Sequence, residues 1–209
     1  FDLIRIDHFR GFESAWAVPA GAPNAIHGTW QPAAGAALFA AIESALGPQA
    51  LVAEDLGLIT PEVDGLRLAL GMPGMRVLQF AFASEAQNPH LPHNFEPLTV
   101  VYPGTHDNPT LCGWWCTLPQ ARQDEIRDYL GVSSVQMPDA FIRLALASVA
   151  RFAIVAFQDL MALGDEARMN TPGTAVGNWS WRMNAADLEG EWRMRWRGHL
   201  LRFGRRHDA

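Results

Sequence analysis

The chain has 209 residues, 49% of them hydrophobic and 18% charged, which is typical of a globular domain with one sizeable core or two small ones. Its net charge of −6 and the spread of its sixteen basic residues, all arginine, argue against nucleic acid or an anionic membrane as the main partner. There is no run of eighteen apolar residues, and two cysteines make no disulfide framework, so we expect a reducing cytoplasm.

The opening segment is apolar over residues 1–4, apart from one acid, and predicts a buried strand that leads into Arg5 and Asp7. Side chains two apart in a strand point to the same side, so Arg5 can hold the Asp7 carboxylate ionised and oriented. An isolated pair of this kind is more often a structural ion pair than a catalytic one. The chain has no methionine or turn before this strand, which predicts a fragment.

The next elements alternate between helix and strand. Residues 11–35 are rich in glycine, proline and alanine and predict a long loop, which is usually functional in a compact domain. Residues 36–46 predict a helix that ends at Gly47. Residues 51–53 form a short apolar strand that ends in Glu54. Thr60 and Pro61 are typical of the N-cap and first residue of a helix, here extending to about residue 70.

The second half of the chain continues this alternation. Strand patterns occur at residues 75–82 and 98–102, with a polar loop at 83–97 between them, and the later strand leads to Asp107. Residues 119–130 and 139–151 predict helices, and 152–157 predict a last strand. After a loop at 164–183, residues 189–203 predict an amphipathic helix with an apolar stripe of Trp192, Trp196 and Leu200.

This order of elements predicts an α/β fold with a parallel sheet and right-handed crossovers. In such folds the chemistry gathers at the carboxyl ends of the strands, which is where Asp7, Glu54 and Asp107 lie. About five strands are present, whereas a closed barrel needs eight. An open doubly wound sheet is the alternative, but the chain lacks a glycine-rich phosphate turn.

Three acids at strand ends favour glycoside chemistry, which needs one ionised carboxylate and one protonated carboxyl. Glu54 follows an apolar run that could raise its pKa, while Arg5 favours the ionised form of Asp7. Asp107 lies between His106 and Asn108, where it could accept hydrogen bonds from a pair of substrate hydroxyls. Any one of these acids alone would more often be structural.

Several motifs together resemble one known family. They are R-I-D-H-F-R-G-F at 5–12, A-E-D-L-G at 53–57, P-G-M with V-L-Q-F-A-F at 73–82, G-T-H-D-N at 104–108, E-A-R-M-N at 166–170 and G-N-W-S-W-R at 177–182. In this order they resemble the 4-α-glucanotransferases, or amylomaltases, of glycoside hydrolase family 77 in the α-amylase superfamily. The resemblance covers nearly the whole chain.

The resemblance implies a role for each acid. Asp7 would be the nucleophile, Glu54 the general acid/base, and Asp107 the carboxylate that stabilises the transition state through sugar hydroxyls. Four residues would contact substrate or hold the nucleophile, namely Arg5, His106, Phe80 and Asn178. The implied reaction is a retaining double displacement that passes an α-1,4-glucan segment from a donor to the 4-hydroxyl of an acceptor. No metal or other cofactor is implied.

The resemblance also implies a (β/α)8 TIM barrel. The chain would supply its C-terminal part, about the fourth to eighth strands, as one partial catalytic domain over residues 1–209 with the N-terminal portion missing. Two departures from the family pattern affect loop geometry: Ala33-Ala34-Gly35 replaces Gly-Pro-Gly, and Pro103 replaces a threonine. The alternatives are an α-amylase-like hydrolase and a truncated, non-catalytic fragment that binds glucan weakly, because half a barrel leaves unpaired strand edges.

Other polar and aromatic residues have simpler interpretations. Cys112 and Cys116 are expected to be ordinary buried thiols, since four well-spaced metal ligands are lacking. His90 and His93 are expected to be loop histidines. The tryptophans at 16, 30, 114 and 115 could either stack on sugars or fill a core, and the first two are favoured for sugar because their loop follows the Asp7 strand.

Overall fold

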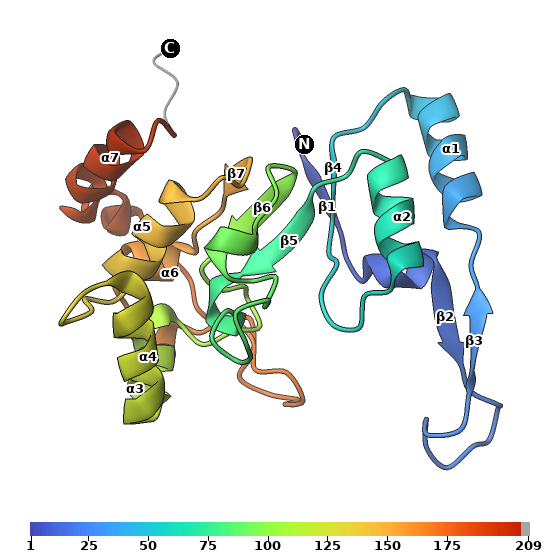
Figure 1. The fold of residues 1–209 in the computed structure, drawn as a ribbon, viewed down its shortest axis with the longest axis horizontal. Coiled ribbons are helices and arrows are strands. Elements are labelled where there is room, and N and C mark those ends of the chain that lie inside the picture. Colours follow the sequence, from blue (N-terminus) through green and yellow to red (C-terminus); the bar gives the residue numbers. More distant parts are fainter. Residues whose placement is uncertain (206–209) are drawn as a thin grey trace. The chain divides into compact units, whose positions relative to one another are not determined.

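A computed structural model describes residues 1–205, in which short strands alternate with helices (Figure 1). The chain divides into two compact units, Phe1–Met75 and Arg76–Ala209. The α/β class predicted from the sequence is confirmed. No helix in the described part of the chain is both long and apolar enough to cross a membrane.

The first unit is built on two parallel strands. Strand β1 (Ile4–Ile6) pairs with β4 (Leu51–Ala53), with Ile4 opposite Leu51 and Ile6 opposite Ala53. Helices α1 (Gly35–Leu46) and α2 (Pro61–Ala69) belong to the same unit. Its core consists of the buried side chains of Phe9, Phe39, Ala53, Val63 and Met72. Burial of this apolar surface stabilises the unit and the two strands that lead into Asp7 and Glu54.

The long loop predicted at residues 11–35 is wrong in part, because two strands lie within it. A 3-10 turn (Phe9–Phe12) is followed by β2 (Ser14–Ala17) and β3 (Thr29–Pro32), which form an antiparallel hairpin (Figure 1). Trp16 lies directly opposite Trp30, and their ring centroids are 5.3 Å apart. A cross-strand aromatic pair of this kind stabilises a hairpin, even though the flanking sequence has no apolar alternation.

Helix α2 begins where the sequence predicted. Thr60 is the N-cap residue and Pro61 the first helical residue, with Glu62 and Asp64 in the first turn. The Thr60 side chain makes no capping hydrogen bond to the helix backbone. The start of α2 therefore rests on the fixed φ of Pro61 and on acidic side chains near the positive end of the helix dipole.

The sheet of the second unit has the order β5-β6-β7, formed by β5 (Gly74–Val77, which begins in the first unit), β6 (Thr99–Tyr102) and β7 (Phe152–Ala153). Strands β6 and β7 are parallel, with Val100 opposite Phe152. Two of the predicted strands were too long. The first ends at Val77 and passes into a 3-10 turn (Leu78–Phe80), and the last ends at Ala153, before α6 (Phe157–Leu160). In both cases apolar residues continue past the strand because they enter the core, so hydrophobicity alone did not mark the strand end.

Besides α6, the described part of the second unit contains the helices α3 (Leu111–Thr117), α4 (Gln120–Leu130), α5 (Asp139–Ala147) and α7 (Trp192–Arg202). Helix α3 was not predicted, and its N-cap Thr110 accepts a hydrogen bond from the Gly113 N–H. Helix α5 ends four residues earlier than predicted. The Arg205 guanidinium donates to the carbonyls of Leu146, Ser148 and Ala150, which satisfies main-chain groups at this helix end.

The core of the second unit joins these helices to the sheet. Its buried members include Leu78, Val101, Leu111, Phe141 and Trp196. The apolar stripe predicted in the last helix is confirmed, because Trp196 is buried and Trp192 and Leu200 pack against the same cluster. Three further 3-10 turns (Pro92–Asn94, Asp165–Ala167 and Ala185–Glu189) lie in segments predicted as loop or at the edge of a helix.

Candidate active site

Two of the predicted acids lie at the carboxyl ends of neighbouring parallel strands. The Glu54 N–H donates to the Ile6 carbonyl at 2.9 Å, and the Phe9 N–H donates to the Glu54 carbonyl at 3.0 Å. These bonds extend the β1–β4 ladder by one step, so Asp7 and Glu54 leave the sheet side by side. Strand pairing therefore positions both acids.

Arg5 contacts the Asp7 carboxylate, as the strand alternation predicted. Its Nη1 lies 2.8 Å from Asp7 Oδ1, and its Nε donates to the Met75 sulfur at 3.2 Å. The Arg5 side chain is 30% exposed, whereas that of Asp7 is 77% exposed. The cation thus holds the carboxylate at the strand end while leaving most of it accessible to a ligand.

Glu54 has a different environment. Its two carboxylate oxygens accept hydrogen bonds from the main-chain N–H groups of His8, at 2.7 Å, and Leu56, at 3.1 Å. Burial raises the pKa of Glu54 above its usual value, against the lowering effect of those two N–H donors and of Arg5, and the Asp7 charge adds a smaller upward contribution. Glu54 therefore keeps its proton to a higher pH than an ordinary glutamate does.

The main chain is strained beside this pair. His8 has φ 46° and ψ 52°, in the left-handed region that residues with a Cβ rarely adopt. This conformation aims the His8 N–H at Glu54 Oε2 and starts the 3-10 turn that carries Phe9 into the core. Strain of this kind persists where the surrounding packing fixes it, and it often marks functional sites.

The neighbouring acid, Asp55, has a structural role. It is buried, it accepts a hydrogen bond from the Met75 N–H at 2.5 Å, and it lies 3.5 Å from Arg67. A side chain at Gly74 would collide with this carboxylate. In the A-E-D-L-G segment, Glu54 is therefore half-buried beside Asp7, whereas Asp55 is buried and anchors the start of β5.

Asp107 and His106 belong to the second unit, in the loop after β6. The Asp107 carboxylate accepts a hydrogen bond from Asn170 Nδ2 at 2.6 Å, and His106 Nε2 lies 3.5 Å from the same oxygen. The Arg168 guanidinium donates to the Asp107 carbonyl at 2.7 Å. The His106 ring packs against Trp179 with centroids 5.2 Å apart. The third acid is thus held by side chains from a segment about sixty residues later.

Phe80 and Asn178, the other two predicted contacts, also lie in the second unit. Phe80 is 38% exposed and meets the His90 ring edge-on at 5.5 Å, so part of the ring remains open to a ligand. The Asn178 amide is engaged within its own loop, where it accepts from the Thr171 N–H and donates to the Thr174 carbonyl. Asn178 therefore shapes this loop.

Sequence reasoning assigned no role to Arg168, Asn170 or Trp179, although it singled out the motifs that contain them. Trp179 has φ 58°, and its main-chain N–H donates to the Met169 carbonyl at 2.6 Å. The sequence shows several polar and aromatic residues in this long loop, which indicates a functional loop. That pattern does not predict which residues the side chains contact.

The cysteine and histidine predictions need one correction. Cys116 is exposed rather than buried, while Cys112 is partly buried and burial raises the pKa of its thiol. His90 Nδ1 accepts a hydrogen bond from the Val77 N–H at 3.0 Å, and burial, with a smaller effect of Arg76, lowers its pKa to about 4. Among residues 1–205 no group of three or more His, Cys, Asp or Glu side chains could hold a metal ion.

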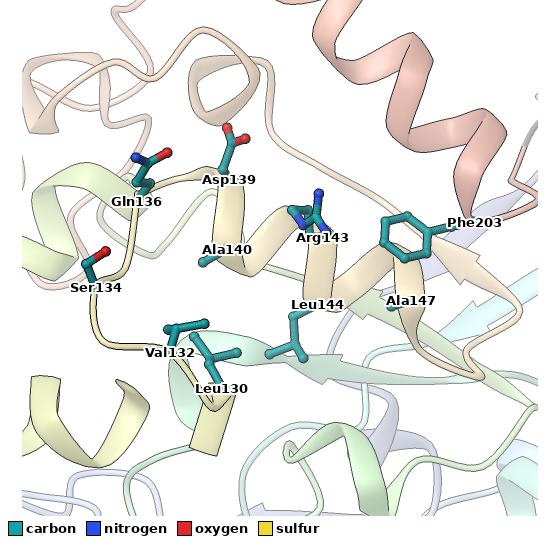
Figure 2. Close-up of a pocket in the computed structure, with 10 residues that line it drawn as sticks. All are labelled: Leu130, Val132, Ser134, Gln136, Asp139, Ala140, Arg143, Leu144, Ala147 and Phe203. Atoms are coloured by element: carbon teal, nitrogen blue, oxygen red, sulfur yellow. The ribbon is translucent and has the colours of Figure 1, made fainter. Parts of the chain in front are cut away.

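The tryptophans divide into two pairs. Trp114 and Trp115 pack against the core of the second unit, which favours the core-filling interpretation. Trp16 and Trp30 are 39% and 45% exposed on the hairpin, and the Arg10 guanidinium lies 3.9 Å from the centre of the Trp30 ring. A separate cavity of about 570 Å³ lies along α5. Its lining, drawn in Figure 2, includes Arg143, Asp139 and Phe203 but not Asp7, Glu54 or Asp107.

Comparisons with known proteins agree with these observations. The family model described as 4-alpha-glucanotransferase, glycoside hydrolase family 77, matches residues 1–188. A chloroplastic/amyloplastic 4-alpha-glucanotransferase of Solanum tuberosum is 52% identical over 184 residues, which cover 88% of this chain and 32% of that protein. The 4-alpha-glucanotransferase of Thermus thermophilus is 47% identical over 199 residues, covering 91% and 40%. The chain therefore spans about a third of the length of these relatives.

Two solved structures are similar to the chain. An amylomaltase from Streptococcus agalactiae in complex with acarbose gives a TM-score of 0.89 at 33% identity, over 98% of this chain and 42% of that one. An amylomaltase from Corynebacterium glutamicum gives 0.71 at 19% identity, over 95% and 35%, which is a likeness of fold alone.

Proposed function

The chain belongs to the 4-alpha-glucanotransferase family, glycoside hydrolase family 77, and we propose that the whole protein transfers segments of α-1,4-glucan to the 4-hydroxyl of an acceptor glucan. The observation that carries this proposal is the pair of unlike carboxyls at adjacent strand ends. Asp7 is exposed beside a cation, and Glu54 is half-buried with a raised pKa. Environments that separate two carboxyls in this way suit a nucleophile and a general acid.

The proposed reaction is a retaining double displacement. An Asp7 oxygen attacks the anomeric carbon while the bond to the leaving oxygen breaks, and Glu54 gives that oxygen its proton. The product is a covalent glycosyl-enzyme with an ionised Glu54. Glu54 then takes the proton of the acceptor 4-hydroxyl, whose oxygen attacks the anomeric carbon and releases Asp7. Proton and bond counts return to their starting values.

We also propose that Asp107 accepts hydrogen bonds from sugar hydroxyls in the transition state. Its side chain is 48% exposed, and its Oδ1 accepts a hydrogen bond from Asn170. Arg5, His106 and Phe80 would contact the substrate or hold the nucleophile, and Asn178 would lie near the cleft. That a similar amylomaltase was solved with acarbose supports an α-glucan as ligand.

The proposed architecture is the C-terminal part of a (β/α)8 barrel, about its fourth to eighth strands, forming a partial catalytic domain. Parallel pairing in both units and acids that follow β1, β4 and β6 support it, since barrel enzymes carry their chemistry at the carboxyl ends of strands. The chain by itself is proposed to be inactive, and no cofactor is proposed. A cytoplasmic location stays a prediction from cysteine usage.

Incubation of the whole protein with maltotriose tests the proposed function. Transfer should produce glucose together with maltodextrins longer than the substrate, because water is excluded while an acceptor is held in place. Glucose and maltose without longer products would favour the α-amylase-like hydrolase. The isolated 209 residues serve as the comparison, and transferase activity with a cooperative thermal transition in that segment would contradict its proposed inactivity.

A further inference from the structure

Hydrogen bonds link the loop that contains Asp107 to the later segment that contains Arg168 and Asn170. Asn170 Nδ2 donates to Asp107 Oδ1 at 2.6 Å, and the Asn170 N–H donates to the His106 carbonyl at 3.0 Å. Arg168 donates from Nη2 to the Asp107 carbonyl at 2.7 Å and from Nε to the Asn170 carbonyl at 2.8 Å. One asparagine and one arginine thus bind the main chain of the Asp107 loop as well as its carboxylate.

Resting on the proposed function, we propose that Asn170 is a positioning residue that fixes the Asp107 carboxylate for the sugar, and that Arg168 holds Asn170 in place. The amide Nδ2 donates hydrogen bonds and cannot accept them. It can therefore bind a carboxylate oxygen, but it cannot accept a hydrogen bond from the sugar hydroxyl in place of the carboxylate. His106 approaches the same oxygen, Oδ1. In the described part of the second unit these contacts engage Oδ1, and Oδ2 would then be the oxygen that accepts from the sugar.

Arg168 can hold Asp107 and Asn170 together because its guanidinium is planar and carries several donors in fixed directions. It bonds the carbonyls of Asp107 and Asn170 at the same time, and these two residues are the partners of the 2.6 Å bond. Its ion pair with Asp165 is long, at 4.0 Å, so its main contacts are these carbonyls. A lysine at 168 would keep the charge and lose the paired geometry.

The Asp107 loop is also fixed from the side of the sheet, which explains why a single added hydrogen bond can orient the carboxylate. Gln79 is buried, its N–H donates to the Pro103 carbonyl at 3.2 Å, and its Nε2 donates to the Pro109 carbonyl at 2.9 Å. A side chain at Gly104 would press on this amide. With both ends of the loop held, Asn170 needs to restrict only the Asp107 side chain.

A double-mutant cycle in the whole protein tests this proposal. The variants are Asn170→Ala, Asp107→Ala and their combination, with the affinity for acarbose measured by calorimetry and turnover on maltotriose measured alongside. Asn170→Ala should weaken acarbose binding about tenfold, the size expected for a hydrogen bond to a charged group. In the Asp107→Ala background it should weaken binding less than about twofold, because Asn170 acts through Asp107. Equal weakening in both backgrounds, or none in either, would overturn the proposal.

Further variants separate positioning from loss of fold. Asn170→Asp keeps the shape and places a carboxylate against Asp107, so it should lose at least as much affinity as Asn170→Ala, and it replaces that variant if Asn170→Ala does not fold. Arg168→Lys should give a smaller loss of the same kind. Asn184→Ala is the matched control, since this exposed asparagine caps the 3-10 turn at Ala185–Glu189 and should leave acarbose affinity unchanged.

Failure of the proposed function can be told apart from failure of this inference. If the wild-type protein makes no maltodextrins longer than maltotriose and does not bind acarbose, the proposed function is wrong. Crystal structures of the wild-type protein and Asn170→Ala then decide the positioning role. A single Asp107 side-chain position that becomes displaced or multiple in the variant supports the role, and an unchanged Asp107 position overturns it.

Discussion

The two units hold their acids by different means. In the first unit, strand pairing places Asp7 and Glu54 side by side, and two main-chain N–H groups bind the Glu54 carboxylate, while the Arg5 side chain contacts that of Asp7. In the second unit, Asp107 is bound by the side chain of Asn170, 63 residues further along the chain. Glu54, which is bound by the backbone, should tolerate changes in nearby side chains but not in backbone conformation. Asp107, which is bound by a side chain, should show the reverse.

The largest effect is expected from the acids of the first unit. In the whole protein, Asp7→Asn should lower maltotriose turnover by about a thousandfold or more and abolish the covalent glycosyl-enzyme, because an amide is a poor nucleophile. Turnover and mass spectrometry of the trapped enzyme measure the two outcomes. Asp2→Asn, at an exposed position five residues earlier, is the control. Retained turnover in Asp7→Asn would refute the assignment.

The pH profile is expected to report the protonation of Glu54. Its raised pKa extends the protonated form upward in pH, so kcat/KM should fall about tenfold per pH unit above that pKa. A glucosyl fluoride donor has a leaving group that needs no proton, so the first step with this donor should not slow at high pH. Glu54→Gln should still carry out this first step with the fluoride. If the rate with the fluoride also falls at high pH, the fall belongs to a group other than Glu54.

The same raised pKa has a cost in stability. For a carboxyl whose pKa is higher in the folded state, the stabilising contribution is fully present below the unfolded value. It is lost as pH rises through the folded-state pKa. The melting temperature of the wild type should therefore fall as pH rises through this window, and that of Glu54→Gln should change less. An equal change of melting temperature with pH in the two proteins would contradict the raised pKa of Glu54.

A smaller effect is expected from the strained backbone beside Glu54. His8→Val should lower kcat about tenfold and stability by about 2 kcal/mol, since a β-branched residue is unfavourable at φ 46° and the N–H would turn away from Glu54. His8→Gly adopts this φ freely and should stay within about twofold of the wild-type kcat. Steady-state kinetics and thermal melting measure both variants. Equal losses would show that the imidazole matters rather than the backbone.

The smallest effect is expected at Trp179, whose ring packs against His106 in the loop that carries Asp107. Trp179→Ala removes the contact with His106 and should raise KM about threefold, the size of one aromatic contact at a partly exposed position. Trp179→Phe keeps a ring and should lose less. If the alanine variant matched the wild type in KM and kcat, side-chain support of this loop would be limited to Asn170 and Arg168.

Local patterns predicted much of the first unit correctly. The strand at 51–53, the helix start at Pro61 and the same-side placement of Arg5 and Asp7 follow from alternation, capping and fixed φ, which act over a few residues. The hairpin at Ser14–Pro32 was missed, because it depends on Trp16 and Trp30 meeting across strands rather than on a local pattern. The strand ends at Val77 and Ala153 were missed because apolar residues continue into the core.

By itself, the sequence determined the α/β class, the strand-end placement of Asp7, Glu54 and Asp107, and the family to which the chain is similar. These depend on residue type and short-range periodicity, which are written directly in the chain. The tertiary structure alone decided how the acids are held: the burial that raises the Glu54 pKa, the left-handed turn at His8, and the Asn170 contact to Asp107. Burial and contacts between distant segments depend on packing, and no local pattern encodes them.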